Sequence, residues 1–298
     1  MKRVLVTGGN GFVGRSCLPL LASRGFEIHA VTRRPPPDIA ATRWHHENVR
    51  DPAEMQALLS SVRPTHLLHL AWCTAPGVFW ASPENLDWLH SSVALFRTFE
   101  QSGGTRIVAT GSCAEYDWTE GTCSERTTPC RPGTLYGRTK LAAAAYLDAM
   151  RQASLSTAWA RLFFLYGREA SEHRIPGVVI SALQRNEPAK CSEGTQLRDF
   201  LHINDAARGI VSLIDGDITG PVNICSGIAT PIRWMAEHVA ELMGKRDLLK
   251  IGALPMPAHD PPMIVGDNSR LREEVGWCAT MTLESGLRDT ISGWHSQQ

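Results

Sequence analysis

The sequence predicts an α/β protein built on a doubly wound parallel sheet with helices on both faces. In the first half of the chain, short runs rich in apolar and β-branched residues alternate with segments of helical length. A glycine-rich turn joins the first of these runs to the first helical segment. Strand–helix alternation gives parallel strands, because each crossover helix returns the chain to the same edge of the sheet. After about residue 166 the alternation loosens and prolines interrupt it, which predicts a smaller mixed α/β C-terminal lobe.

The individual elements follow from compact apolar runs bounded by turn residues. We expect strands, in chain order, at Arg3–Thr7, Glu27–Thr32, Thr42–His46, His66–Ala71, Arg106–Gly111 and Thr157–Leu165. The helices are expected between them, at Gly11–Arg24, 51–62, Pro83–Gln101 and Thr134–Arg151. Asp51 and Pro52 mark the start of the second helix, because an aspartate side chain caps free N–H groups and proline has no N–H to satisfy.

The composition is typical of a soluble globular protein. Hydrophobic residues make up 43% of the 298 residues and charged residues 20%, and 30 basic side chains balance 30 acidic ones. Because there is no bulk field, we expect no nucleic-acid partner and no membrane association. No apolar run reaches the ~20 residues of a membrane span. Lys2 and Arg3 lead straight into the first strand and leave no room for a signal peptide, so we expect a cytoplasmic protein.

The eight cysteines form no metal or redox motif. The closest pair, Cys123 and Cys130, is too far apart for C-x-x-C spacing. Scattered reduced thiols are typical of cytosolic enzymes. We therefore expect no metal site.

Three glycines separate the first predicted strand from the first helix, in the stretch Gly8-Gly9-Asn10-Gly11-Phe12-Val13-Gly14. A dinucleotide pyrophosphate needs a tight turn, close backbone approach and a helix N-terminus directed at it. Glycine supplies the first two, because a Cβ atom would obstruct them. This turn predicts a dinucleotide site with six contact residues, which are Gly8, Asn10, Gly11, Phe12, Val13 and Gly14. We place the dinucleotide-binding domain at residues 1–166, rejoined by part of 198–226, and the substrate-binding lobe at 167–298.

The end of the second predicted strand indicates which dinucleotide binds. The sequence there reads Thr32-Arg33-Arg34, and no carboxylate follows before Asp38. An acidic residue would accept hydrogen bonds from an adenosine ribose, whereas two guanidinium groups suit a 2′-phosphate. We therefore expect Thr32, Arg33 and Arg34 at the ribose and favour NADP(H). NAD(H) stays open, because both arginines can instead be solvated surface residues.

Several motifs, taken in order, give the chain a family resemblance. The glycine turn, Ser112, and Tyr136 with Lys140 are followed by RDFLHINDAARGI (198–210), NICSG (223–227) and REEVGW (272–277). This set resembles the extended short-chain dehydrogenase/reductases of the NAD-dependent epimerase/dehydratase type, over nearly the whole chain. The resemblance implies a Rossmann-type sheet and nucleotide-sugar chemistry. GSCAEYDW (111–118) and RLFFLYG (161–167) look most like a subgroup of 4-keto-6-deoxyhexose reductases.

The resemblance assigns catalysis to Ser112, Tyr136 and Lys140, and the chemistry of these side chains fits it. Residues four apart on a helix share a face, so Tyr136 and Lys140 can address one cofactor. A free phenol has a pKa of about 10 and a free lysine about 10.4, so neither moves protons at neutral pH alone. A nearby ammonium, with the positive charge of an oxidised nicotinamide, is expected to lower the pKa of Tyr136. Tyr136 would then exchange a proton with a carbonyl oxygen that Ser112 polarises.

The residues after Ser112 bear on the type of reaction. Dehydratases of the family carry an Asp-Glu pair there, whereas this chain has Cys113-Ala114 and its nearest carboxylate, Glu115, one position late. On an extended stretch that shift turns the side chain to the opposite face, which disfavours a dehydratase. Family enzymes that use a cysteine carry it two positions beyond the serine, so Cys113 is more typical of packing.

A 4-ketoreductase and a 4-epimerase remain. The arginines after the second strand favour an NADPH-dependent reductase of a nucleotide-linked keto-sugar. An epimerase that holds NAD tightly is the alternative enzyme. A protein that senses the dinucleotide without catalysis is a third hypothesis, although such a protein would typically lack the tyrosine or the lysine.

The resemblance also implies residues around the cofactor and the substrate. Asn48 and Val49 are expected at the adenine, and Leu70 and Ala71 against the dinucleotide. The residues expected at the substrate, a small molecule of the nucleotide-sugar class, are Trp72, Ser112, Cys113, Arg174 and Arg198. Trp72, Trp80 and Trp88 follow the fourth strand, where they can wall the pocket or pack in the core.

Arg198 resembles the family arginine that binds the nucleotide diphosphate, a role that suits a guanidinium fork. Its alternative is a structural ion pair with Asp199 or Asp205. Two departures weaken the diphosphate assignment: Phe164 replaces a family asparagine, and no second arginine occurs in 255–262. The alanine-rich segment Leu141–Ala145 resembles the helix that pairs subunits, which implies a homodimer.

Overall fold

A computed structural model describes residues 2–34, 38–151, 155–168, 172, 174–256 and 260–294. Its largest sheet, within these residues, has seven strands, and every neighbouring pair is parallel. In spatial order the strands are β11 (Gly220–Ile224), β7 (Ser156–Leu162), β5 (Arg106–Ser112), β4 (His66–His69), β1 (Arg3–Thr7), β2 (Glu27–Val31) and β3 (Thr42–His45). The order reverses between β1 and β4, which confirms the predicted doubly wound sheet.

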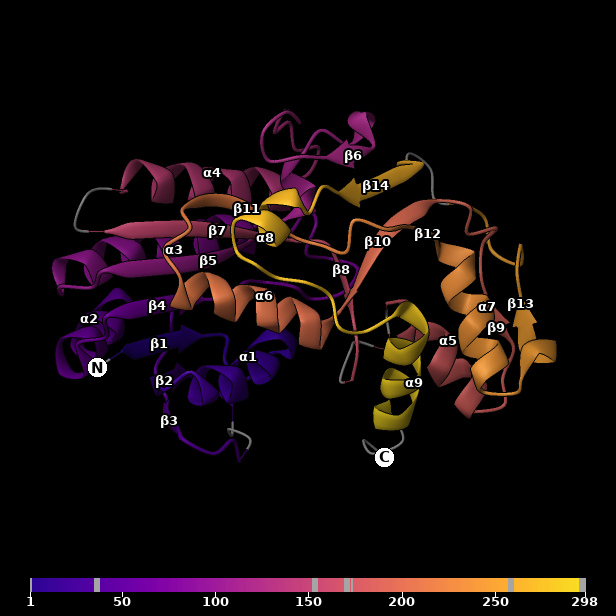
Figure 1. Ribbon diagram of the computed structural model, residues 1–298, viewed down its shortest axis with the longest axis horizontal. Coiled ribbons are helices and arrows are strands. Elements are labelled where there is room, and N and C mark those ends of the chain that lie inside the picture. Colours follow the sequence, from indigo (N-terminus) through magenta and orange to yellow (C-terminus); the bar gives the residue numbers. More distant parts are fainter. Residues whose placement is uncertain are drawn as a thin grey trace.

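Helices cover both faces of this sheet (Figure 1). One face carries α1 (Phe12–Ser23) and α6 (Ile203–Asp215), which pack over a core containing Val4, Val6 and Ile210. The other carries α2 (Pro52–Val62), α3 (Glu84–Gln101) and α4 (Leu135–Ala149), over a core containing Leu5, Phe96 and Leu147. Successive residues of β1 therefore point to opposite cores, as expected for a strand buried on both faces.

The second lobe lies beyond the carboxyl ends of the large sheet (Figure 1). Its mixed sheet is built around β10 (Leu197–His202), which pairs antiparallel with one neighbour and parallel with two. The other elements are β12 (Ala229–Pro231), β14 (Met263–Gly266), β6 (Thr122–Cys123), β8 (Phe164–Tyr166), the pair β9 (Ala189–Lys190) and β13 (Leu249–Lys250), the helices α5 (Gly177–Gln184), α7 (Ile232–Leu242), α8 (Ser269–Glu273) and α9 (Leu283–Trp294), and the short turns η1 (Cys113–Glu115), η2 (Trp118–Glu120) and η3 (Arg246–Leu248).

The single strand predicted at Thr157–Leu165 is wrong, because the chain divides there into two strands. β7 stays in the large sheet beside β5, whereas β8 leaves it and pairs with β10. The residue between them, Phe163, is buried and donates its N–H to the carbonyl of Ile224. The apolar run continues through both strands, so the sequence carries no local sign of the change in partner.

The large sheet is completed from the second half of the chain. α6 packs beside α1, and β11 pairs in parallel with β7. This return agrees with the expectation that part of 198–226 rejoins the first domain, while the boundary near residue 166 stays a prediction. None of the described helices is long and apolar enough to span a membrane.

Candidate active site

The carboxyl ends of β1, β4 and β5 meet at one edge of the large sheet. The glycine turn follows β1, Leu70 and Ala71 follow β4, and Ser112 ends β5. The first turns of α4 add Tyr136 and Lys140 to the same edge. In open α/β sheets this edge, at the point where the strand order reverses, is where ligands bind.

The glycine turn is packed too closely for any side chain. Gly8 has a φ of +72° and accepts a 2.9 Å hydrogen bond from the N–H of Gly11. A Cβ atom on Gly8 would lie 2.8 Å from the backbone nitrogen of Ala71, and one on Gly14 would lie 2.6 Å from Cα of Gly9. Gly11 caps α1 without a side-chain hydrogen bond, so N–H groups of the first helical turn have no side-chain partner. A bare turn before an uncapped helix fits a dinucleotide pyrophosphate.

The residues expected at the ribose come together beside this turn. The side-chain amide of Asn10 donates to the hydroxyl of Thr32 across 3.5 Å, which connects the turn to the end of β2. The same hydroxyl accepts from the backbone N–H of Arg34 at 3.1 Å. Thr32 is buried, whereas the side chains of Arg33 and Arg34 are exposed. The two guanidinium groups are therefore open to a phosphate at this end of the strand.

Phe12 and Val13 carry the turn into the helix by packing. Val13 packs against the core under α1 and α6, and Phe12 packs against the core of the second lobe. Asn48 is already engaged, because its amide oxygen accepts from the backbone N–H of Arg50 at 3.2 Å. Its expected contact with the adenine stays a prediction.

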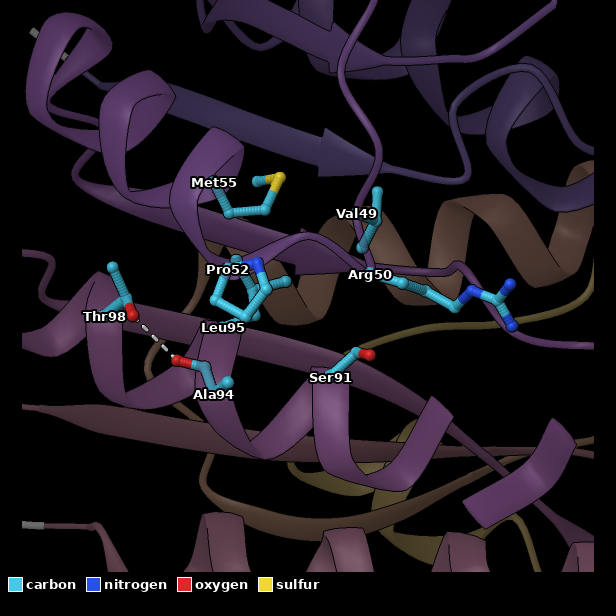
Figure 2. Close-up of a pocket in the computed structure, with 8 residues that line it drawn as sticks. All are labelled: Val49, Arg50, Pro52, Met55, Ser91, Ala94, Leu95 and Thr98. Atoms are coloured by element: carbon cyan, nitrogen blue, oxygen red, sulfur yellow. Dashed lines mark hydrogen bonds between the residues drawn. The ribbon is translucent and has the colours of Figure 1, made fainter. Parts of the chain in front are cut away.

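A small surface pocket lies beside Val49, between α2 and α3 (Figure 2). Its lining residues are Val49, Arg50, Pro52, Met55, Ser91, Ala94, Leu95 and Thr98. None of these residues is a predicted catalytic residue. We therefore place the chemistry at the edge of the sheet described above and not in this pocket.

Lys140 is buried in an almost entirely uncharged setting. Its side chain is on a residue only 3% exposed, and Nζ donates to the carbonyl of Thr110 at 2.8 Å. Nζ also lies 3.8 Å from the centre of the Trp72 ring, a cation–π geometry. Burial lowers the pKa of Lys140 to about 7, against a small opposing effect of the Glu115 carboxylate. This lysine can therefore change its charge near neutral pH.

Tyr136 is buried beside Lys140, and burial raises the pKa of its phenol. A side-chain hydrogen bond with Ser112 and the charge of Arg174 act in the opposite direction but are smaller. The protein's own groups thus do not produce the lowered pKa that we expected, because desolvation penalises the phenolate more than its neighbours favour it. In this state Tyr136 is a proton donor. The contribution of an oxidised nicotinamide to its acidity stays a prediction.

Ser112 lies within hydrogen-bonding reach of Tyr136, as the catalytic assignment requires. It ends β5 and caps η1, where its hydroxyl accepts from the N–H of Ala114 at 3.2 Å. The structure thus brings together Ser112, Tyr136 and Lys140, which lie on two different elements.

Glu115 is removed from catalysis by a buried ion pair that the sequence did not indicate. Arg161 donates to its carboxylate at 2.7 Å and the indole of Trp159 at 2.9 Å, and the carboxylate also accepts from the N–H of Ser112. The side chain is fully buried. With both oxygens engaged, this carboxylate is not available to remove a proton from a substrate. Cys113 is also buried, and burial raises its pKa, which agrees with a packing role.

Trp72 and Trp88 pack in the protein and stack on each other at 6.4 Å between ring centres. The indole N–H of Trp72 donates to the side chain of Asn85 at 2.9 Å. Trp80 is different, because it is exposed and its ring meets that of Tyr136 edge to face at 5.7 Å. Of the three tryptophans after β4, Trp80 is the one with a large exposed surface beside the catalytic phenol.

Arg198 is held by a carboxylate that the sequence did not single out. Its guanidinium binds Asp260 at 2.6 Å and the carbonyl of Pro261 at 2.9 Å. The expected ion pair is thus present, but its partner is neither Asp199 nor Asp205. Arg174 is exposed, and its guanidinium carbon lies 6.0 Å from the ring centre of Phe79. The substrate-binding roles of both arginines stay predictions.

The sequence did not indicate Phe79, Asn85, Trp118 or Arg161, which surround the catalytic residues. Each acts through a contact with a segment far along the chain, and none belongs to a spaced motif. Among the residues that the structure describes, no group of three or more His, Cys, Asp or Glu side chains is placed to hold a metal ion.

Comparisons with known proteins agree with this arrangement. Residues 4–225 match the model of the NAD dependent epimerase/dehydratase family. The dTDP-6-deoxy-L-talose 4-dehydrogenase (NAD(P)(+)) of Kitasatospora kifunensis is 28% identical over 306 residues, which cover 96% of this chain and 94% of that protein. A UDP-glucose 4-epimerase of Rhizobium leguminosarum bv. trifolii is 24% identical, with 99% and 98% covered.

Solved structures show the same fold. MoeE5 in complex with UDP-glucuronic acid and NAD superposes with a TM-score of 0.86, at 29% identity, covering 99% of this chain and 100% of that one. The UDP-glucose 4-epimerase of Thermus thermophilus, in complex with NAD, gives a TM-score of 0.87 at 23% identity, with 99% and 100% covered. The family match spans well over half of the chain and includes the glycine turn, Ser112, Tyr136 and Lys140. The chain therefore belongs to the NAD dependent epimerase/dehydratase family and is an NAD(P)-dependent enzyme of the extended short-chain dehydrogenase/reductase type.

Proposed function

We propose that this enzyme is an NADPH-dependent reductase of a nucleotide-linked 4-keto-6-deoxyhexose. The observation that carries the proposal is the placement of Ser112, Tyr136 and Lys140 beside the glycine turn, with no acidic residue free to catalyse elimination. Glu115, the nearest carboxylate in sequence, is held by Arg161 and Trp159. A site equipped with a proton donor and a carbonyl-polarising hydroxyl suits reduction of a ketone.

In this mechanism the protein handles the proton and the substrate oxygen. Tyr136 donates its phenolic proton to the carbonyl oxygen of the substrate, and Ser112 donates a hydrogen bond to the same oxygen. Lys140 lies in the same buried region and, when protonated, favours the phenolate that remains on Tyr136. NADPH, when bound at the glycine turn, supplies the hydride.

The substrate class is supported by the named relatives. The talose relative acts on a dTDP-linked 6-deoxy sugar, and MoeE5 binds UDP-glucuronic acid, so both are nucleotide-sugar proteins. The choice of NADPH is supported by Arg33 and Arg34, whose exposed guanidinium groups follow β2 where an acidic residue would favour NAD.

A nucleotide-sugar 4-epimerase with tightly held NAD is the second candidate. It uses the same three catalytic residues, and UDP-glucose 4-epimerases are among the relatives and solved structures. The two functions differ in how the cofactor is held: a reductase exchanges it in every turnover, whereas an epimerase retains it.

The test is the nucleotide content and preference of the purified enzyme. Freshly purified protein is denatured and the released nucleotide identified. Dissociation constants for NADPH and NADH are then measured for the native protein, Arg33→Ala and Arg34→Ala. We expect an exchangeable site that binds NADPH about tenfold tighter than NADH, a difference of ~1.4 kcal/mol. At least one arginine variant should lose most of that preference while NADH affinity stays within about twofold. Stoichiometric NAD in the purified protein contradicts the reductase and supports the epimerase.

A further inference from the structure

Three aromatic side chains form one wall beside the catalytic phenol. Phe79 and Trp80 precede α3, and Trp118 begins η2 after Ser112. The rings of Phe79 and Trp80 meet Tyr136 edge to face at 5.0 Å and 5.7 Å, and Trp80 meets Trp118 edge to face at 6.2 Å. We call Phe79, Trp80 and Trp118 the aromatic wall.

The wall is fixed by hydrogen bonds to buried groups. Asn85, which is fully buried, donates to the backbone carbonyls of Phe79 at 2.7 Å and Ser82 at 2.9 Å. The backbone N–H of Tyr136 donates to the carbonyl of Trp80 at 3.1 Å. The indole N–H of Trp118 is engaged by the carbonyl of Cys113 at 2.8 Å. The segment that carries Phe79 and Trp80 is thus tied directly to the catalytic helix.

Trp80 presents bare apolar surface at this position. It is 40% exposed although it is a large aromatic residue. The one charged group in printed contact with the wall is Arg174, 6.0 Å from the centre of the Phe79 ring. A substrate carbonyl that reaches Tyr136 therefore passes an apolar wall, with a cation at its edge.

Such a wall distinguishes sugars by the group on carbon 5. A methyl group placed against Trp80 removes apolar surface from water, which is favourable. A hydroxymethyl group in the same place must give up hydrogen bonds to water, because the wall offers its oxygen no free partner. The two sugars differ by a single oxygen atom, so the wall alone is enough to separate them.

We propose that the aromatic wall selects 6-deoxyhexoses, with Trp80 contacting the methyl group of the substrate. The inference rests on the proposed function, because it needs a hexose at Tyr136. It goes beyond it by naming the residues that would exclude hexoses with a 6-hydroxyl.

The test compares matched substrates that differ only in the 6-hydroxyl. Oxidation is followed with NADP⁺ for dTDP-6-deoxyglucose against dTDP-glucose, and for the corresponding galactose pair, in the native enzyme and two variants. Trp80→Leu keeps an apolar side chain, whereas Trp80→Gln offers a hydrogen-bonding partner. Trp234→Leu, a half-buried tryptophan on α7, is the control.

We expect kcat/KM of the native enzyme to favour the 6-deoxy sugar by about ten- to a hundredfold. Trp80→Leu should keep most of this ratio, Trp80→Gln should bring it within about threefold of unity, and Trp234→Leu should leave it unchanged. Equal use of both sugars by the native enzyme, or an unchanged ratio in Trp80→Gln, overturns the wall while the proposed function stands. If no member of either pair is oxidised or bound, the proposed function fails and the wall fails with it.

Discussion

Tyr136 and Lys140 are buried side by side, and burial moves the pKa of each away from its usual value. The pKa of the phenol rises and that of the ammonium falls to about 7. Both shifts have the same cause, since desolvation penalises the charged form of each group. The pair is therefore most comfortable as a neutral phenol beside an amine that is partly charged at neutral pH. This is the protonation state from which reduction of a ketone starts.

The first prediction concerns the proton donor. Tyr136→Phe removes the hydroxyl and keeps the ring that contacts the aromatic wall. We expect kcat to fall by about 10²- to 10⁴-fold, because general acid catalysis contributes that much. The dissociation constant for NADPH should stay within about threefold. Tyr146→Phe, on the same helix, is the matched control and should retain activity. Near-native turnover by Tyr136→Phe would show that another group donates the proton.

The second prediction concerns the ionisation of Lys140. Its pKa is about 7 in the folded protein and 10.5 for an unperturbed lysine, so between these values the unfolded chain binds more protons. Stability contributed by this group must then rise with pH from about 7 to 10.5. Below pH 7 both states are protonated and the contribution is constant.

Urea unfolding of the native enzyme and Lys140→Met at several pH values measures this contribution. The free energy of unfolding of the native enzyme should gain on that of the variant between pH 7 and 9, by up to ~1.4 kcal/mol per pH unit. A difference that is flat or that shrinks over this range would mean that Lys140 is not desolvated as the structure shows.

Among the secondary-structure elements, the β1–α1 turn positions the cofactor site most directly. It was predictable from sequence because its determinants are local: a strand, three glycines and a helix within the first 24 residues. The structure adds the reason for two of those glycines. Gly8 touches the backbone of Ala71 after β4, and Gly14 packs under Gly9.

The third prediction tests this packing. Gly14→Ala places a Cβ atom 2.6 Å from Cα of Gly9, so the turn must widen or the helix must shift. We expect NADPH affinity to fall at least tenfold and stability to fall by about 1–3 kcal/mol, as for other overpacked sites. Gly133→Ala is the control, because a Cβ there meets nothing within 4 Å. Equal NADPH affinity of the two variants, measured by fluorescence titration, would contradict the close packing of the turn.

Elements whose partners lie far along the chain were harder to predict. The strand expected at Thr157–Leu165 divides because β8 pairs with β10, about 36 residues later, and nothing in its own apolar run records that partner. Arg198 shows the same limit. An ion pair was expected with the neighbouring Asp199 or with Asp205, but the guanidinium binds Asp260. Local sequence indicated the type of interaction and not the residue.

For the whole molecule, the order of the strands explains why so many separate residues meet at one edge. Parallel strands place all their carboxyl ends together, so Gly8, Ala71 and Ser112 converge although they are far apart in sequence. The three catalytic residues were identified from sequence by resemblance and are close together in the structure. The aromatic wall was not identified as a unit, because its members come from segments that only the fold brings together. The homodimer expected from the alanine-rich part of α4 stays a prediction.

The most direct test of the account is the fate of the hydride in a single turnover. The enzyme is mixed with a dTDP-linked 4-keto-6-deoxyhexose and NADPH that carries deuterium at the transferable position of the nicotinamide. We predict one deuterium on carbon 4 of the sugar for each NADPH oxidised, with the product released and the oxidised cofactor exchangeable. A sugar that is not reduced, or a matched nucleotide sugar whose carbon 4 inverts with no deuterium gained and no net oxidation of NADPH, would contradict the reductase.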